Sequence, residues 1–154
     1  MNMKRMGAGL AVASALFLNA CVTPTTSDGS VAVKKPIGPV SVSGDCEQRD
    51  EMGHYDKITI DVKDNVVNKL DWTAKPRGRS CRFELKSFTQ VSSTPTANLQ
   101  HKKDKNCHVF VWQDERYITV ATNNCRKVCS QNDRLLPVLL NPKTGACQKA
   151  TADV

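Results

Sequence analysis

The chain has 154 residues, seven of them cysteine, and a formal net charge of +7 from 22 basic and 15 acidic residues. After the N-terminal segments described below, about 110 residues remain, which is enough for one domain of ordinary size and excludes a second. No stretch reaches the roughly 20 apolar residues of a membrane-spanning helix, so none is expected.

Residues 1–20 have the parts of a secretory signal peptide. Lys4 and Arg5 supply the positive charge, and an uncharged apolar run over residues 7–17 ends in small residues. This run is too short to span a membrane. The sequence therefore predicts that the chain is exported and that residues 1–20 are removed, which leaves a net charge of +5.

The end of this signal, Leu18-Asn19-Ala20-Cys21, resembles the lipobox of bacterial lipoproteins. In that family the cysteine thiol is diacylglycerylated, the chain is cut before it, and the new amine is acylated. The resemblance implies that Cys21 is the lipid-attachment residue, and several acyl chains together anchor a protein stably. Val22 stands where Asp favours the inner membrane in that family, which implies an outer-membrane protein facing the periplasm or the cell surface. The alternative is an ordinary cleaved signal with Cys21 left unmodified.

The cysteine count agrees with lipidation, because an odd number is unexpected in an exported protein. With Cys21 lipidated, six cysteines remain, and an oxidising compartment favours three disulfides among them. The sequence does not fix their connectivity. We predict the pairs Cys46–Cys81, Cys107–Cys125 and Cys129–Cys147.

Residues 21–44 are predicted to be the lipidated cysteine and a flexible tether, and residues 45–154 the folded domain. The tether is rich in Pro, Thr, Ser and Val and has no helical period. A flexible chain of this length spans about 25–30 Å, which lifts the domain away from the lipid headgroups.

Alternating apolar and polar residues predict a series of β-strands in the domain. Residues 63–65 have turn chemistry between the first two of them, which predicts a hairpin. Residues 75–79 are predicted to form a basic loop and residues 91–105 a long polar loop. The predicted strands cover residues 58–62, 66–72, 81–85, 107–112, 117–122 and 135–140, the last being an edge strand because it contains Pro137. The expected fold is mostly β, a small antiparallel sandwich or barrel stapled by disulfides.

Two details concern the strand over residues 107–112. Pairing Gln113 with Arg116 across a turn would place Cys107 opposite Thr122 and within reach of Cys125, which motivates that disulfide. The other parity of the strand carries the aromatic set His108, Phe110 and Trp112. These rings lie either on the inner side of a closed barrel or sandwich, which we prefer, or in an exposed patch.

The sequence has no recognisable catalytic motif: no Gly-x-Ser-x-Gly elbow, no His-Glu-x-x-His and no glycine-rich phosphate loop. Cys125 and Cys129 could in principle bind a metal with His108, but the spacing and the compartment favour disulfides. We expect a protein that is not an enzyme, with no cofactor and no metal, and nucleic acid is a poor partner outside the cytoplasm.

Charge is unevenly distributed along the domain. Residues 45–56 contain five acidic residues and one basic residue, and residues 63–105 contain ten basic and four acidic ones. Opposite charges in two segments indicate two partner surfaces, although solvated strand faces would give the same pattern. The predicted partner surface is Asp45, Glu47, Asp50, Glu51 and Tyr55. The predicted anion-binding residues are Lys75, Arg77, Arg79, Lys102 and Lys103.

The combination of lipobox, tether and small cysteine-bearing β-domain resembles the membrane-bound lysozyme-inhibitor lipoproteins of Proteobacteria. Those inhibitors carry a Ser-Gly-rich loop ending in Tyr, and Ser43-Gly44 and Gly53-His54-Tyr55 are similar to pieces of it, although the residues between them differ. The resemblance implies a binder or inhibitor of a cell-wall lytic enzyme such as lysozyme, with the acidic segment docking locally on a basic partner.

The alternative function is that of a structural or anionic-polymer-binding outer-membrane lipoprotein. Its basic residues would contact lipopolysaccharide or other phosphate groups, which arginine recognises well. Fold class does not decide between the two functions.

Overall fold

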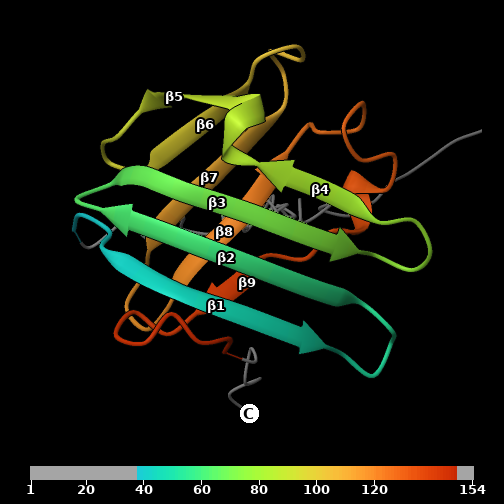
Figure 1. Ribbon diagram of the computed structural model, residues 1–154, viewed down its shortest axis with the longest axis horizontal. Helices are drawn as coiled ribbons and strands as arrows, with labels where there is room; N and C mark the ends of the chain where they lie inside the picture. Colours follow the sequence, from blue (N-terminus) through green and yellow to red (C-terminus); the bar gives the residue numbers. More distant parts are fainter. Residues whose placement is uncertain (1–37, 149–154) are drawn as a thin grey trace, which may run out of the picture. The chain divides into compact units, whose positions relative to one another are not determined.

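Two antiparallel β-sheets make up residues 38–148, the part of the chain that the computed structural model describes (Figure 1). The first sheet has the order β1 (Val42–Arg49), β2 (Tyr55–Lys63), β3 (Val66–Lys75) and β4 (Cys81–Glu84). The second has the order β5 (Phe88–Ser92), β6 (Ala97–His101), β7 (His108–Gln113), β8 (Ile118–Asn123) and β9 (Val138–Leu140). The predicted mostly-β fold is confirmed.

Short 3-10 helices occupy two of the connections. The helix η1 (Leu85–Ser87) carries the chain from β4 into β5, and η2 (Asn132–Arg134) lies between β8 and β9. The sheets pack face to face with their strands crossing (Figure 1). No helix within residues 38–148 is long and apolar enough to cross a membrane. The predicted signal peptide, Cys21 and most of the tether lie outside the described residues.

The core forms from the inward-facing residues of the two sheets. Trp72 and Phe83 of the first sheet have no exposed surface, and their ring centroids lie 5.1 Å apart. The largest fully buried aliphatic side chains are Ile58, Ile60, Leu99, Ile118, Leu140, Val40, Val109, Val111, Val120 and Val138. The alternation that predicts the strands therefore also identifies most of the core.

The β2–β3 hairpin is confirmed, and its turn follows from residue type. Asp64 and Asn65 both have positive φ, 49° and 64°, as a two-residue turn between twisted strands requires. The buried side chain of Asn65 also accepts a hydrogen bond of 2.6 Å from the backbone nitrogen of Val40. This bond fixes the entry of the chain into the domain.

Two predicted boundaries are wrong. The tether does not extend to residue 44, because Val40 is buried and β1 begins at Val42. The inward positions of β1 include a glycine, a cysteine and a glutamine, and three of its four outward positions are charged, so it lacks apolar alternation. Such polarity is typical of an edge strand, because charge discourages pairing with other chains.

The predicted long loop over residues 91–105 is also wrong, because it contains the end of β5 and all of β6. Only Ala97 and Leu99 of β6 face the core, which is too few for a periodic signal. Two predicted strands are shorter than expected. The strand over residues 81–85 ends at Glu84, and β9 begins only after Pro137.

All six cysteines of the domain form disulfides, but only one predicted pair is confirmed. Cys107 pairs with Cys125 at a Cα–Cα distance of 4.2 Å. The predicted pairs Cys46–Cys81 and Cys129–Cys147 are wrong; the structure has Cys46–Cys147 and Cys81–Cys129 instead. Both join strands of the first sheet to segments that follow strands of the second. Their partners therefore depend on how the sheets pack, which local sequence does not reveal.

The register predicted for the β7–β8 hairpin is wrong by two residues. Gln113 pairs with Ile118 rather than Arg116, because the turn occupies residues 114–117 and is closed by a hydrogen bond of 3.0 Å from the Asp114 nitrogen to the Tyr117 oxygen. The Cys107–Cys125 bridge forms just beyond the last pair of the ladder, His108 with Asn123.

The aromatic set on β7 lies outside the core, so the preferred buried alternative is wrong. Val109 and Val111 fill the inner side of the strand, and His108, Phe110 and Trp112 are half-buried on the outer face of the second sheet. His108 and Phe110 stack with their ring centroids 5.7 Å apart.

The β1 edge of the first sheet packs closely against the C-terminal part of the domain. A Cβ placed on Gly44 would lie 2.7 Å from the Cα of Gly145, so only glycines allow this approach. Two residues further along each segment, Cys46 and Cys147 form their disulfide. We call this contact the seam. It holds the β1 edge against the segment that follows β9.

Candidate functional site

A cleft of about 590 Å³ lies beside the β1–β2 hairpin. This volume is in the range of small-ligand and side-chain binding pockets. Residues from the first sheet and its hairpin line one part: Gln48, Arg49, Asp50, Glu51, His54 and Asp56. Residues around β9 line the other part: Leu136, Pro137, Leu139 and Gln148. The cleft therefore combines carboxylates with apolar side chains.

The hairpin tip places its carboxylate by local hydrogen bonds. Asp50 accepts bonds of 2.8 Å from the backbone nitrogen of His54 and, at its other oxygen, 2.8 Å from the His54 ring. Gly53 has φ 83°, which lets the chain turn back here. Partial burial raises the pKa of Asp50, but the bonds from His54 lower it more, so its pKa is below the usual value. Asp50 is thus a charged group of fixed orientation at neutral pH.

Asp56 is the deepest carboxylate of the cleft. It shares the inward parity of Ile58 and Ile60, and the whole residue is only 8% exposed. The Trp72 indole nitrogen donates to it at 2.9 Å. Burial raises the pKa of Asp56, although bonds from Trp72 and Gln48 oppose the rise. No cation forms an ion pair with it within residues 38–148. A buried carboxylate without a cationic partner is costly, and such groups cluster at functional sites.

Apolar side chains are exposed in the lining of the cleft and at the tip of the adjoining β1–β2 hairpin. Leu136 retains 55% of its surface exposed, and Met52 at the hairpin tip retains 63%. Leu139 and Pro137 continue the apolar lining. Exposed apolar side chains next to charged groups are common in protein-binding surfaces.

The structure divides the predicted partner surface. Asp50 and Glu51 line the cleft, whereas Asp45, Glu47 and Tyr55 belong to a network on the outer face of the first sheet. Glu47 accepts a bond of 3.0 Å from the Tyr55 hydroxyl and forms an ion pair of 3.1 Å with Lys57. Lys57 and Tyr55 lower the pKa of Glu47 below its usual value. Asp45 accepts a hydrogen bond from the Thr59 hydroxyl, so both outer-face acids already have partners and are weaker candidates for binding another protein.

Sequence reasoning missed several lining residues. The inward direction of Asp56 could have been read from its parity with Ile58, because residues two apart face the same side of a strand. Leu136 and Pro137 carried no such signal. Their place in the cleft depends on how the second sheet packs beside the hairpin.

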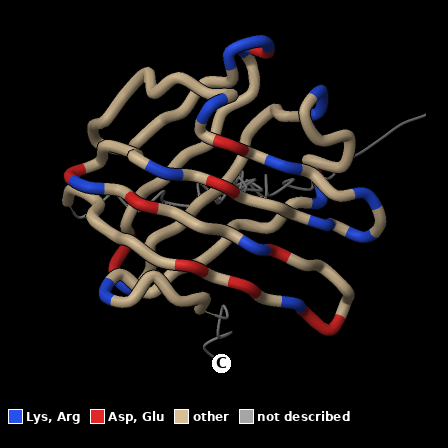
Figure 2. Tube along the Cα trace, viewed as in Figure 1, with Lys and Arg blue, Asp and Glu red and all other residues tan. Residues whose placement is uncertain are grey.

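A second charged surface lies away from the cleft. We call it the basic rim; it comprises Lys75, Arg77, Arg79, Lys102, Lys103, Lys105, Arg126 and Lys127. All eight cations are exposed. Figure 2 shows blue segments in the upper and right-hand parts of the described domain, apart from the red tip of the β1–β2 hairpin at the lower right. The three loop segments that contain them hold one acid, the buried Asp104.

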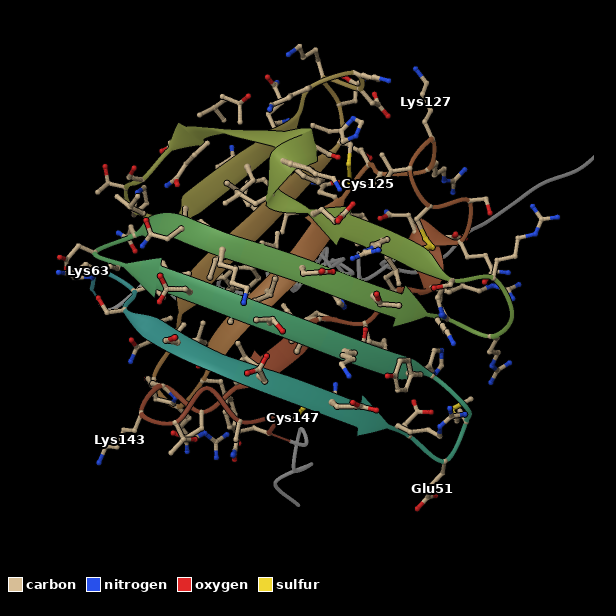
Figure 3. The ribbon with its side chains drawn as sticks, viewed as in Figure 1. Glu51, Lys63, Cys125, Lys127, Lys143 and Cys147 are labelled. Carbon is tan, nitrogen blue, oxygen red and sulfur yellow. A yellow bond between two sulfur atoms is a disulfide. The ribbon has the colours of Figure 1, made fainter. Side chains whose placement is uncertain are left out.

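The predicted anion-binding residues form two groups, and a third segment lies between them. Lys75, Arg77 and Arg79 belong to the β3–β4 connection, and Lys102 and Lys103 to the β6–β7 loop. The intervening segment supplies Arg126 and Lys127, which the sequence analysis did not include. Figure 3 shows Lys127 next to the labelled Cys125. The sequence therefore identified most cations of the rim but not their arrangement.

The described part of the chain contains no cluster of metal-binding side chains. Among residues 38–148, no three His, Cys, Asp or Glu side chains lie close enough to hold a metal ion. Cys125 and Cys129, considered above with His108, are both in disulfides. The structure thus defines a disulfide-stapled β-sandwich with one acidic cleft and one basic rim. No family model, curated protein or solved structure matches the chain.

Proposed function

We propose that the protein is a non-enzymatic, lipid-anchored outer-membrane protein that binds a cell-wall lytic enzyme such as lysozyme through its acidic cleft. The observation that carries the proposal is the buried carboxylate of Asp56 in the cleft, which has hydrogen-bond donors but no ion-pair partner among residues 38–148. A basic side chain from a partner would supply the positive charge that is missing beside Asp56. Such a pair is weakly screened by salt because it is partly desolvated.

The β1–β2 hairpin and the exposed apolar side chains complete the proposed interface. Asp50, held by His54, and the exposed Glu51 would contact cations at the edge of the docked segment. Leu136 and Met52 would bury apolar surface against it, at roughly 25 cal/mol for each Å² removed from water. Local complementarity of this kind sets the register of a complex even when net charges repel.

The test is inhibition of lysozyme-catalysed cell-wall lysis by the purified mature chain carrying Cys21→Ser. We expect dose-dependent inhibition. Asp56→Asn should weaken it at least tenfold, because truncating a partly buried charge contact costs about 2 kcal/mol or more. Glu51→Lys should weaken it as well, because it places a like charge against a basic partner. Asp61→Lys, on the outer face of β2, is the matched control. It makes the same charge change as Glu51→Lys, but it should leave inhibition unchanged. No inhibition at a large molar excess would end this proposal.

A further inference from the structure

The basic rim is assembled by contacts between segments that are far apart in sequence. The Cys81–Cys129 disulfide joins the start of β4 to the segment after β8. The side-chain amide of Gln131 faces the backbone oxygens of Pro76 and Arg77 in the β3–β4 connection. These two contacts hold the Arg77 and Arg79 loop beside the segment that carries Arg126 and Lys127.

The β6–β7 loop is held to the segment that carries Arg126 and Lys127, and also to η1. Cys107, at the end of the loop, forms its disulfide with Cys125. The Lys127 ammonium lies 4.0 Å from an Asp104 carboxylate oxygen, and Lys102 donates a bond of 2.8 Å to the backbone oxygen of Lys86. Three loops thus form one continuous surface whose backbone is covalently constrained.

Among residues 38–148, Lys127 is the one rim cation with an acid within 4.0 Å, and Lys75 lies 5.3 Å from the centroid of the Tyr55 ring. Asp104 is the acid of the three loop segments, it is 7% exposed, and its contacts to the Asn106 nitrogen and Lys127 are both long, at 3.4 Å and 4.0 Å. By contrast, the cations Lys57 and Arg82 on the first sheet have acids at 3.1 Å and 2.9 Å. Eight exposed cations in one arc attract a surface of high negative charge density.

We propose that the basic rim binds the phosphate groups of the anionic lipid surface to which the chain is tethered. This inference rests on the lipid anchor of the proposed function, but it does not depend on the cleft. Arginine forks match phosphate oxygens, and lysines near an anionic bilayer add further attraction. The rim thereby orients the domain on the membrane in addition to the N-terminal anchor.

The length of the chain permits this orientation. The domain begins beside the Val40–Asn65 contact, next to the start of β3, whereas the rim begins at the other end of that strand, at Lys75. A strand of ten residues is about 30 Å long. The residues from 22 to 39 can extend to at most about 60 Å, so an anchored Cys21 does not prevent the rim from reaching the bilayer.

The experiment measures vesicle co-sedimentation of the mature chain carrying Cys21→Ser, so that acyl chains cannot dominate binding. We expect binding to phosphatidylcholine vesicles that contain phosphatidylglycerol, none to pure phosphatidylcholine, and loss as sodium chloride rises from about 0.05 M to about 0.5 M. Arg126→Gln with Lys127→Gln should weaken binding roughly tenfold to thirtyfold, equivalent to about 1 kcal/mol for each cation.

The matched control is Lys63→Gln with Lys143→Gln, two exposed cations away from Lys127 in Figure 3. This pair makes the same change in net charge, but it should weaken binding less than twofold. An equal loss for both pairs would overturn the rim in favour of non-specific attraction, and full binding by the Arg126/Lys127 variant would overturn it outright. The fold of each variant is checked by circular dichroism. Glu51→Lys separates this proposal from the cleft, because it should weaken enzyme inhibition without weakening vesicle binding.

Discussion

The acidic cleft and the basic rim use charge in opposite ways. In the cleft, few carboxylates are placed by regular strands and a tight hairpin, and Asp56 is removed from water beside Trp72. In the rim, many cations remain in water, and disulfides rather than strand pairing bring their loops together. Desolvated charge gives strong, specific and weakly screened contacts, whereas exposed charge gives additive and salt-sensitive ones. The two surfaces are therefore suited to different partners.

The largest effect is expected from removing the disulfides one at a time. Cys46→Ser with Cys147→Ser opens the seam on the cleft side, and the residues are 101 apart in sequence. The chain-entropy model predicts a loss of about 4–5 kcal/mol in the free energy of unfolding, against about 3 kcal/mol for removing Cys107–Cys125. Urea denaturation of the two double variants measures the difference. Equal losses would show that the seam contributes through strain or local structure instead.

A smaller effect is expected from crowding the seam without removing its disulfide. Gly44→Ala would place a Cβ 2.7 Å from backbone of Gly145, which must move because no flexible side chain can yield. Such overpacking costs about 1–3 kcal/mol of unfolding free energy. Gly38→Ala is the control, since nothing lies within 4 Å of its added methyl group. Thermal unfolding that is equally unchanged in both variants would show that the close approach is not required.

Local sequence patterns predicted some strands of this fold but not the contacts between the two sheets. Alternation around Ile58 and Trp72 predicted the β2–β3 hairpin, because period-two burial is a local property of a strand. The same pattern did not predict β1 and β6, whose inward residues are mostly small or polar. Cys107–Cys125 could be predicted because one hairpin brings both residues together. The other disulfides, the cleft and the joined rim depend on how two sheets pack, and no local pattern encodes that packing.

A pH-dependent test probes the desolvated carboxylate of the cleft. Because the pKa of Asp56 is raised in the folded state, the folded protein retains this proton to higher pH than the unfolded chain does. Its contribution to stability is fully present below the unfolded pKa and is lost as pH rises through the folded pKa. Asp56→Asn should remove this loss, so the variant should gain stability relative to the native protein as pH rises.

Two other carboxylates should show the opposite pH dependence in the same series of measurements. Glu47 and Asp71 have lowered pKa values, so their contributions are lost as pH falls through those values, in both the variant and the native protein. Urea midpoints across the acidic range give the difference curve between the two proteins. A flat difference curve would mean that Asp56 titrates normally and is not desolvated. A rise in stability with loss of lysozyme inhibition would indicate that the carboxylate is kept for binding.

The smallest effect is expected where charge is exposed and already paired. Arg82 donates to Asp71 through two nitrogens at 3.3 Å and 2.9 Å, and the two side chains are 59% and 42% exposed. Hydrogen bonding from Arg82 lowers the pKa of Asp71. Arg82→Gln should therefore shift that pKa upward in an NMR titration while leaving the urea unfolding midpoint nearly unchanged, because solvent screens the pair. A clear fall in the urea midpoint would mean that exposed charges contribute substantially to stability in this fold. The cations of the basic rim would then need to be tested for effects on stability as well.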